Sequence, residues 1–219
     1  MVKNILFNFL FYFFCNQIFL FDLNPYENYY SSKSTGSVKE TLEKISENSW
    51  KISSFGKHPL FTINQESIFS IDKGNVFLES GYRKLDILGG LRKDHQTYRV
   101  DKIGDKKVVI YSFGKKKGSI EIEENFYDNL TLQIQIKMNF LKNDQFKINY
   151  FDKGKIKIKS FLNKRDEIIY KSKPVEVFEF TEQRKDKRYF KFLIKNDSDK
   201  ETIKVFQGGR GFNIDWELD

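Results

Sequence analysis

The strongest structural signal in the chain is carried by residues 146–161, which read FKINYFDKGKIKIKSF. Apolar and polar residues alternate on both sides of Asp152-Lys153-Gly154, a sequence typical of a tight turn. Because successive side chains of a β-strand point to opposite faces, this alternation gives each strand one apolar face and one charged face. The segment therefore predicts an antiparallel hairpin that rests on a core with one of its faces.

The same pattern extends through most of the chain. Towards the C-terminus, strands are predicted at 167–170, 175–180, 189–194, 203–206 and 212–218, with polar turns at 163–164 and 196–199. Upstream, strands are predicted at 50–52, 61–71, 76–78, 98–103 and 107–113, and the first of these is expected to stop at Phe55-Gly56. Hairpin turns are predicted at 72–74 and 104–105, a loop at 89–90 and a basic turn at 114–118. The expected fold class is mostly β: a large antiparallel sheet curled over a core, in a single β-rich domain spanning 24–219.

Residues 128–141 fit two kinds of element. Every fourth residue from Leu130 to Met138 is apolar and falls on one helical face, and Asp128 stands where a helix N-cap belongs. The even-numbered residues of the same stretch are also apolar, which fits a strand equally well. Periodicity alone therefore leaves both alternatives open.

The composition favours sheet over helix. Aromatic residues make up 16% of the chain, and the sequence contains no alanine, the best helix former. The 38 Lys and Arg residues exceed the 30 Asp and Glu residues and give a net charge of +8. Because these basic residues are mostly lysines spread along the whole chain, they are interpreted as a solvated surplus, and a nucleic-acid partner is not expected.

Residues 1–23 are predicted to be a signal peptide or N-terminal leader. Lys3 provides a short positive region and residues 5–15 are mostly apolar, which is the pattern of a secretory signal. A retained anchor is the alternative, although polar residues keep the run short of the ~20 apolar residues of a membrane-spanning helix. Cys15, the one cysteine, lies in this leader, so a disulfide within the chain is excluded. Lipidation of Cys15 is disfavoured because the bulky Phe14 precedes it.

Several short motifs follow one another in a characteristic order. They are ESGY at 79–82, FYDNLTLQ at 126–133, the hairpin at 154–161, EII at 167–169, PVEV at 174–177 followed by Arg184 and Arg188, QG at 207–208 and DWEL at 215–218. In this order the chain resembles the bacterial envelope family catalogued as domain of unknown function 3108. It departs from that family in lacking a tryptophan in 189–194 and a proline in 196–202.

The resemblance implies a curved, partly open β-barrel, similar in outline to periplasmic lipoprotein carriers. It also implies that 128–141 forms one central helix, so that the expected architecture becomes an incomplete β-barrel around that helix. Since the family has no established activity, no catalytic residues are carried over to this chain.

Candidate catalytic and metal-binding motifs are all weak. His58 and His95 are isolated, and neither has a second His or Cys at metal-ligand spacing. Ser80 lacks the Gly-x-Ser-x-Gly context of a nucleophile and is interpreted as part of a turn at a strand end. The acidic residues of 121–124 are typical of a solubilised edge, and the glycine-rich 208–211 is not followed by the helix that a phosphate loop needs. No catalytic residue, metal or cofactor is predicted.

Two features could serve a ligand. Arg184, Lys185, Lys187 and Arg188 form the densest basic cluster; they are weak candidates for a basic rim, and the simpler interpretation is a charged hairpin turn. The 23 phenylalanines either fill the core of the sheet or line a cavity for acyl chains.

The leading functional hypothesis is a periplasmic or envelope-associated, non-enzymatic protein that binds a hydrophobic or lipid-like ligand in a β half-barrel and has a role in cell-envelope assembly. The alternative is an interaction or scaffold module that docks an envelope protein through a sheet edge or the basic hairpin. An envelope hydrolase is the least favoured hypothesis. Membrane contact is expected only through the leader or through weak surface attraction.

Overall fold

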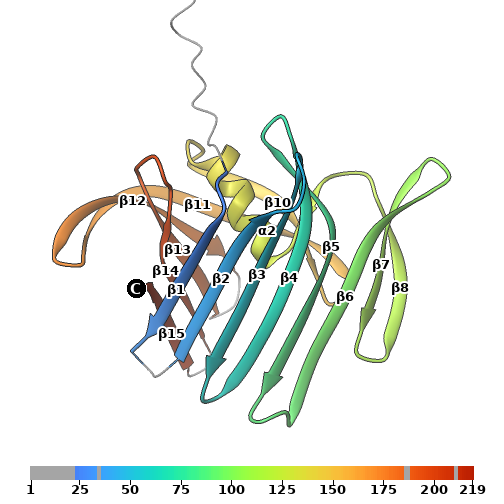
Figure 1. Cartoon of the computed structure of the whole chain (residues 1–219), viewed down its shortest axis with the longest axis horizontal. Helices are drawn as coiled ribbons and strands as arrows, with labels where there is room; N and C mark the ends of the chain where they lie inside the picture. The colour runs from blue at the N-terminus through green and yellow to red at the C-terminus, as the bar shows by residue number, and fades with distance from the viewer. Residues whose placement is uncertain (1–22, 34–35, 185–187, 210–211) are drawn as a thin grey trace, which may run out of the picture.

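The computed structural model describes residues 23–33, 36–184, 188–209 and 212–219, which form one continuous β-sheet with a short helical segment against its concave face (Figure 1). The sheet has fifteen strands in the order β8-β7-β6-β5-β4-β3-β2-β1-β15-β14-β13-β12-β11-β10-β9. The first and last strands are therefore neighbours in the middle of the sheet, and Tyr30 of β1 pairs with Leu218 of β15.

The strands and helices follow one another along the chain with short connections. Their bounds are β1 Tyr26–Ser32, β2 Gly36–Lys44, β3 Ser49–His58, β4 Phe61–Asp72, β5 Asn75–Ile87, β6 Arg92–Ile103, β7 Lys106–Phe113, β8 Lys116–Ile122, β9 Phe126–Tyr127, α2 Asn129–Gln135, η1 Ile136–Phe140, β10 Gln145–Asp152, β11 Lys155–Tyr170, β12 Lys173–Gln183, β13 Tyr189–Lys195, β14 Thr202–Gly209 and β15 Phe212–Leu218. All strand pairs are antiparallel except β9 with β10. The predicted fold class is confirmed: a mostly antiparallel, open and curved sheet with one helical segment.

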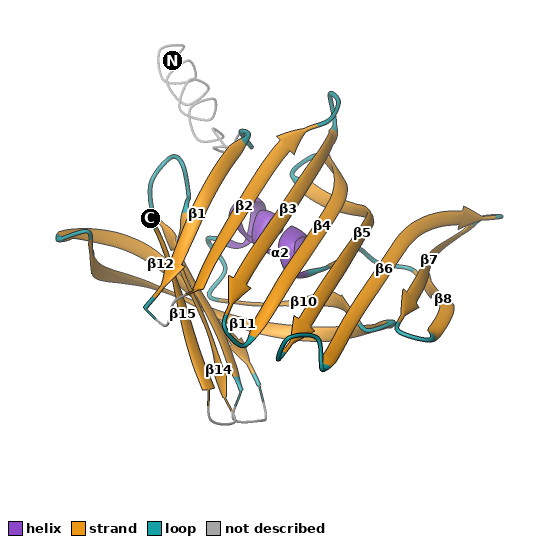
Figure 2. Cartoon of the chain, turned by 60° about the horizontal axis from the view of Figure 1, so that its bottom comes forward, coloured by secondary structure: helices purple, strands orange, loops and turns teal. Residues whose placement is uncertain are grey.

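The helical segment begins where the sequence places an N-cap. Asp128 accepts hydrogen bonds from the backbone N–H groups of Leu130 and Thr131, and the Thr131 side chain accepts one from the backbone N–H of Asp128, which completes a capping box. The α-helix then widens into the π-helical turns of η1. Figure 2 shows this segment inside the curve of the sheet, behind β2, β3 and β4.

The core lies between the helical segment and the two halves of the curved sheet. Its largest cluster joins helix residues to strands β2–β5 on one side and β10–β13 on the other. Phenylalanine rings form a row from Phe140 at the end of the helical segment into the second side. Ring centroids lie 4.4 Å apart for Phe140 and Phe146, 5.4 Å for Phe146 and Phe161, 6.2 Å for Phe161 and Phe192, and 5.1 Å for Phe192 and Phe180. Much of the interior of the half-barrel is thus filled by side chains and by the helical segment.

The predicted turn at Asn163-Lys164 is wrong, because β11 runs unbroken through these residues. Asn163 pairs with Phe180 of β12, and its side-chain amide donates a 2.9 Å hydrogen bond to the backbone oxygen of Leu141. Asn163, half of the pair that suggested a turn, instead links the long strand to the end of the helical segment.

Three further predicted boundaries are also wrong. Strand β3 continues past Gly56 to His58, and a Cβ at Gly56 would lie 2.9 Å from Ile63, so this glycine makes room for a neighbouring strand. Ser80 lies within β5 and pairs with Arg99 of β6. Strand β8 begins at Lys116, inside the stretch expected to be a basic turn.

The predicted leader lies outside the described residues except for Leu23, whose side chain packs against the largest core cluster. Within the described part of the chain, none of the helical segments has the length and apolar character required to span a bilayer.

Candidate functional site

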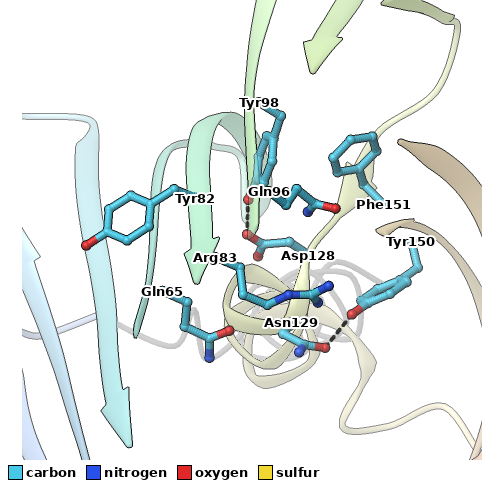
Figure 3. Close-up of a pocket in the computed structure, with 9 residues that line it drawn as sticks. All are labelled: Gln65, Tyr82, Arg83, Gln96, Tyr98, Asp128, Asn129, Tyr150 and Phe151. Carbon is cyan, nitrogen blue, oxygen red and sulfur yellow. Dashed lines mark hydrogen bonds between the residues drawn. The ribbon is translucent and has the colours of Figure 1, made fainter. Parts of the chain in front are cut away.

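A small pocket lies beside the start of α2, where the concave face of β4–β6 approaches β10 (Figure 3). Nine residues line it: Gln65, Tyr82, Arg83, Gln96, Tyr98, Asp128, Asn129, Tyr150 and Phe151. Most of them carry polar groups that point toward one another, and they come from strands far apart in sequence. The pocket is therefore a product of the tertiary fold.

Asp128 is the centre of the hydrogen bonds in this pocket. Its carboxylate accepts from the hydroxyls of Ser67 and Tyr98, from the Thr131 hydroxyl at 2.8 Å, and from the N–H groups of Leu130 and Thr131 at 3.1 and 2.9 Å. Burial, together with the neighbouring Asp128 carboxylate, raises the pKa of Tyr98 well above its ordinary value. Tyr98 therefore remains a neutral donor that fixes the carboxylate to the sheet.

Arg83 carries the positive charge of the pocket and contacts two carboxylates. Its guanidinium lies 2.9 Å from Asp152 and 3.4 Å from Asp94, which also forms an ion pair with Lys153. Although burial works to raise the pKa of Asp152, the Arg83 charge outweighs it and the pKa of Asp152 is lowered. The Nε group of Arg83 is buried and has no hydrogen-bond partner among the described residues.

A second charged cluster borders the pocket at Tyr150. The Tyr150 hydroxyl donates a 2.5 Å hydrogen bond to Asn129, and the Lys159 ammonium lies 3.5 Å from the centre of the Tyr150 ring. Burial lowers the pKa of Lys159, although Glu182, 3.4 Å away, works against this. The cation is thus held between an aromatic face and a carboxylate on the concave side of the sheet.

The pocket itself is too small to hold an organic ligand. The space open to the centre of a water molecule is about 10 Å³, which is room for about one water. We conclude that the pocket attaches the helical segment to the sheet.

Replacement of Gly81 by alanine is expected to disturb this pocket. A Cβ at Gly81 would lie 2.4 Å from the Tyr98 hydroxyl and 2.6 Å from the backbone oxygen of Glu66. Because the backbone atom cannot move away cheaply, we expect Gly81→Ala to lower the free energy of unfolding by about 1–3 kcal/mol, measured by urea denaturation. Ser80→Ala, in the same strand, is the control; an equal loss in both variants would contradict the assignment.

Next to the pocket, the concave face of β4 and β5 is apolar and incompletely covered. Register pairs Gln65 with Arg83 at the pocket, then Ile63 with Leu85, then Phe61 with Ile87 towards the end of the sheet. Since residues two apart in a strand share a face, these pairs lie in successive rows on the pocket side. We call Phe61, Ile63, Leu85 and Ile87 the apolar strip.

The apolar strip extends beyond the part of the sheet that the helical segment covers. All four side chains are half-buried. Among the described residues, Phe61 packs at the margin of one buried cluster, and the three clusters contain none of the other three. Polar groups of the pocket thus adjoin an apolar surface that is accessible to solvent.

Of the predicted basic rim, the described residues Arg184 and Arg188 do not line the pocket. Arg184 forms a 2.9 Å ion pair with Glu182 of β12, and Arg188, before β13, also has an interaction partner. Lys185 and Lys187 lie outside the described residues. A ligand-binding role for this cluster stays a prediction.

The two isolated histidines have different neighbours. His58 stacks on Phe61 with ring centroids 5.0 Å apart, whereas His95 pairs with Asp86 at 2.9 Å. In the described ranges, no group of three His, Cys, Asp or Glu side chains converges as metal ligands do.

The sequence pointed to Asp128 and missed the rest of the site. An N-cap has a local signature, and Asp128 was expected from it. Arg83, Tyr98 and Tyr150 have no such signature, because the pairing of distant strands brings them together. In the sequence, the four residues of the apolar strip look like ordinary strand residues. Only the position of the helical segment shows that it leaves this part of the sheet uncovered.

Comparisons with known proteins support the architecture. No protein-family model matches the chain, and no curated protein matches it. Among solved structures, it is similar to a β-barrel-like protein of domain of unknown function DUF1849 from Brucella abortus, with a TM-score of 0.59 and 9% identity over 90% of this chain and 96% of that chain. This likeness shows the β-barrel-like fold. The neighbour belongs to a different domain of unknown function from the predicted 3108, so the finding supports only the broader description, a β-barrel-like protein of unknown function.

Proposed function

We propose that this chain is an exported, non-enzymatic half-barrel protein that binds a hydrophobic or lipid-like molecule on its apolar strip and serves assembly of the cell envelope. One observation carries the proposal: the strip places four half-buried apolar side chains side by side on a concave surface, next to a polar pocket. Ligand sites commonly combine a concave apolar lining with a few convergent polar groups.

The energetics of the strip fit a modest binding site. Complete burial of a Leu, Ile or Phe side chain contributes about 1.5–3 kcal/mol. Because no more than about a third of each of these four side chains is exposed, their further burial can contribute at most about 2–4 kcal/mol together. Part of this is lost to the entropy of association. An amphipathic molecule would therefore gain most of its affinity from the strip and its orientation from the polar groups around Arg83.

A polar substitution in the strip is expected to weaken binding of a neutral apolar probe. We expect Leu85→Gln to weaken the affinity for N-phenyl-1-naphthylamine by about five- to tenfold, because one wall of the strip loses its apolar surface. Fluorescence titration of the full chain measures this directly. The matched control is Ile103→Gln, since Ile103 is 59% exposed at the far end of β6 from the strip.

The proposal fails if the wild-type chain does not bind the probe, or if both variants bind it as the wild type does. Thermal unfolding of each variant separates loss of the site from loss of the fold. Native mass spectrometry of the protein purified from its own cells would then identify the natural ligand by its mass.

A second candidate function is a scaffold that adds a partner's strand to an open sheet edge. Strand β8 ends the order of described strands and pairs only with β7, so one row of its backbone groups faces away from the sheet. Two lysines at its start, Lys116 and Lys117, are typical of an edge protected against unwanted pairing. Failure of the probe to bind would favour this second candidate.

A further inference from the structure

Three exposed leucines gather at one end of the sheet. Leu60 lies in the turn between β3 and β4, and Leu88 and Leu91 lie in the turn between β5 and β6. Their exposed fractions are 46%, 54% and 88%, respectively. The two turns lie side by side at the lower end of the sheet in Figure 1, and the backbone N–H of Leu88 donates a 2.8 Å hydrogen bond to the oxygen of Leu60. We call these three residues the leucine tip.

The backbone of the leucine tip is held in an unfavourable conformation. Leu88 has a φ of +51°, a region that favours glycine, and it is the one apolar residue among the described non-glycine residues with positive φ. Gly89 and Gly90 follow with φ of +67° and +92° and complete the turn. Apolar residues at a strained, exposed turn cost stability, and strain of this kind concentrates at ligand contacts and switch regions.

Basic side chains flank the leucine tip. Lys57 precedes the first turn, and Arg92 and Lys93 follow the second; all three are exposed. Of the carboxylates on the same strand ends, Asp94 forms ion pairs with Arg83 and Lys153, and Asp86, which contacts His95, is outnumbered by the three cations. The local charge is therefore positive, in agreement with the net charge of +8 of the chain.

We propose that the leucine tip and its three flanking cations form a docking site for an anionic lipid bilayer. The leucines enter the interfacial region, and Lys57, Arg92 and Lys93 remain at the level of the phosphate groups. An apolar tip surrounded by cations matches a surface with negative headgroups above a hydrocarbon interior. The charge complementarity favours this occupant over a protein partner, which would need a shaped counterpart to the three leucines.

The position of the leucine tip relative to the apolar strip adds to the argument. Phe61 adjoins Leu60 in the chain, and Ile87 adjoins Leu88, so the strip begins where the tip ends. Docking through the tip would turn the open end of the strip towards the bilayer. The docking site nevertheless stands without the ligand proposal, because its residues are distinct.

Hydrogen–deuterium exchange of the full chain with vesicles tests the docking site by location. With vesicles of phosphatidylcholine and phosphatidylglycerol, we expect slower exchange at 58–61 and 88–91, and unchanged exchange at the turn between β6 and β7, which contains no part of the tip. Vesicles of phosphatidylcholine alone should give much less protection. Unchanged exchange in both leucine turns would overturn the proposal, whatever the affinity of the chain for vesicles.

Variants test the contribution of each kind of side chain. Vesicle co-sedimentation should show that Leu88→Ser/Leu91→Ser weakens binding by roughly tenfold or more, and that Lys57→Gln, Arg92→Gln and Lys93→Gln each weaken it by roughly fivefold.

Ile103→Ser is the matched control for an exposed apolar residue. Leu85→Gln should keep vesicle binding, which separates this site from the apolar strip. Wild-type protection of the leucine turns in the double variant would contradict the proposal; should that variant fold poorly, Leu91→Ser alone serves.

Discussion

Asp128→Ala is expected to lower the free energy of unfolding by about 3–5 kcal/mol. Loss of an N-cap side chain costs about 1 kcal/mol. The larger part comes from the buried hydroxyls of Ser67 and Tyr98, which donate to this carboxylate and would be left without their acceptor. A buried polar group without a partner costs about 1–3 kcal/mol. Urea denaturation followed by circular dichroism measures the change.

Asp128→Asn provides the matched control for this effect. Its amide oxygen can still accept from the backbone N–H groups at the start of α2, and only the charge and one acceptor are lost. We expect about half the destabilisation of the alanine variant. If alanine and asparagine were both tolerated with losses below about 1 kcal/mol, Asp128 would not attach the helical segment to the sheet.

Phe161→Ala is expected to cost about 3–5 kcal/mol, in the range for truncation of a buried aromatic side chain. Phe161 is fully buried, and its ring centroid lies 5.4 Å from that of Phe146 and 6.2 Å from that of Phe192. Its removal would leave a cavity in the aromatic row that fills the half-barrel. The measurement is again the free energy of unfolding by urea denaturation.

The matched control for Phe161 is Phe55, which is 52% exposed on β3. Phe55→Ala removes the same atoms from a position that is half in water, so we expect a loss below about 1 kcal/mol. Similar losses at both positions would mean that the interior of the sheet is not packed as described.

Local rules predicted the helix start and most strands, because each of these has a signature in neighbouring residues. Strands β1 and β2 lie in a more polar stretch and were not predicted. The alternation around Asp152-Lys153-Gly154 gave a hairpin that pairs Phe146 with Phe161. Asp128 marked the start of a helix, but periodicity left helix and strand open. The resemblance to an envelope family favoured the helix, and the structure confirms it.

Long-range pairing explains what could not be predicted. Asn163-Lys164 has the composition of a turn, yet β11 pairs with β12 from Ser160 to Tyr170, and this pairing overrides the local preference. The pocket depends on the register between Arg83 and Gln96 and on the approach of Tyr150 from the other half of the sheet. Contacts of this kind cannot be predicted from any single stretch of the sequence.

The leucine tip was equally hidden in the sequence. Gly89-Gly90 indicated a loop, but Leu60 lies in a different turn, which pairing of β4 with β5 brings alongside. The same pairing sets Ile63 beside Leu85 and so creates the apolar strip. Both proposed sites therefore depend on the register of one strand pair.

Methyl NMR of the isoleucine- and leucine-labelled chain, titrated with N-phenyl-1-naphthylamine, tests the central claim most directly. The account predicts that the methyl signals of Ile63, Leu85 and Ile87 shift with the probe while that of the exposed Ile103 does not. Shifts confined to the buried Ile134 and Ile52, or no shift at any methyl of the apolar strip, would contradict the claim that this open concave surface is where the protein binds its ligand.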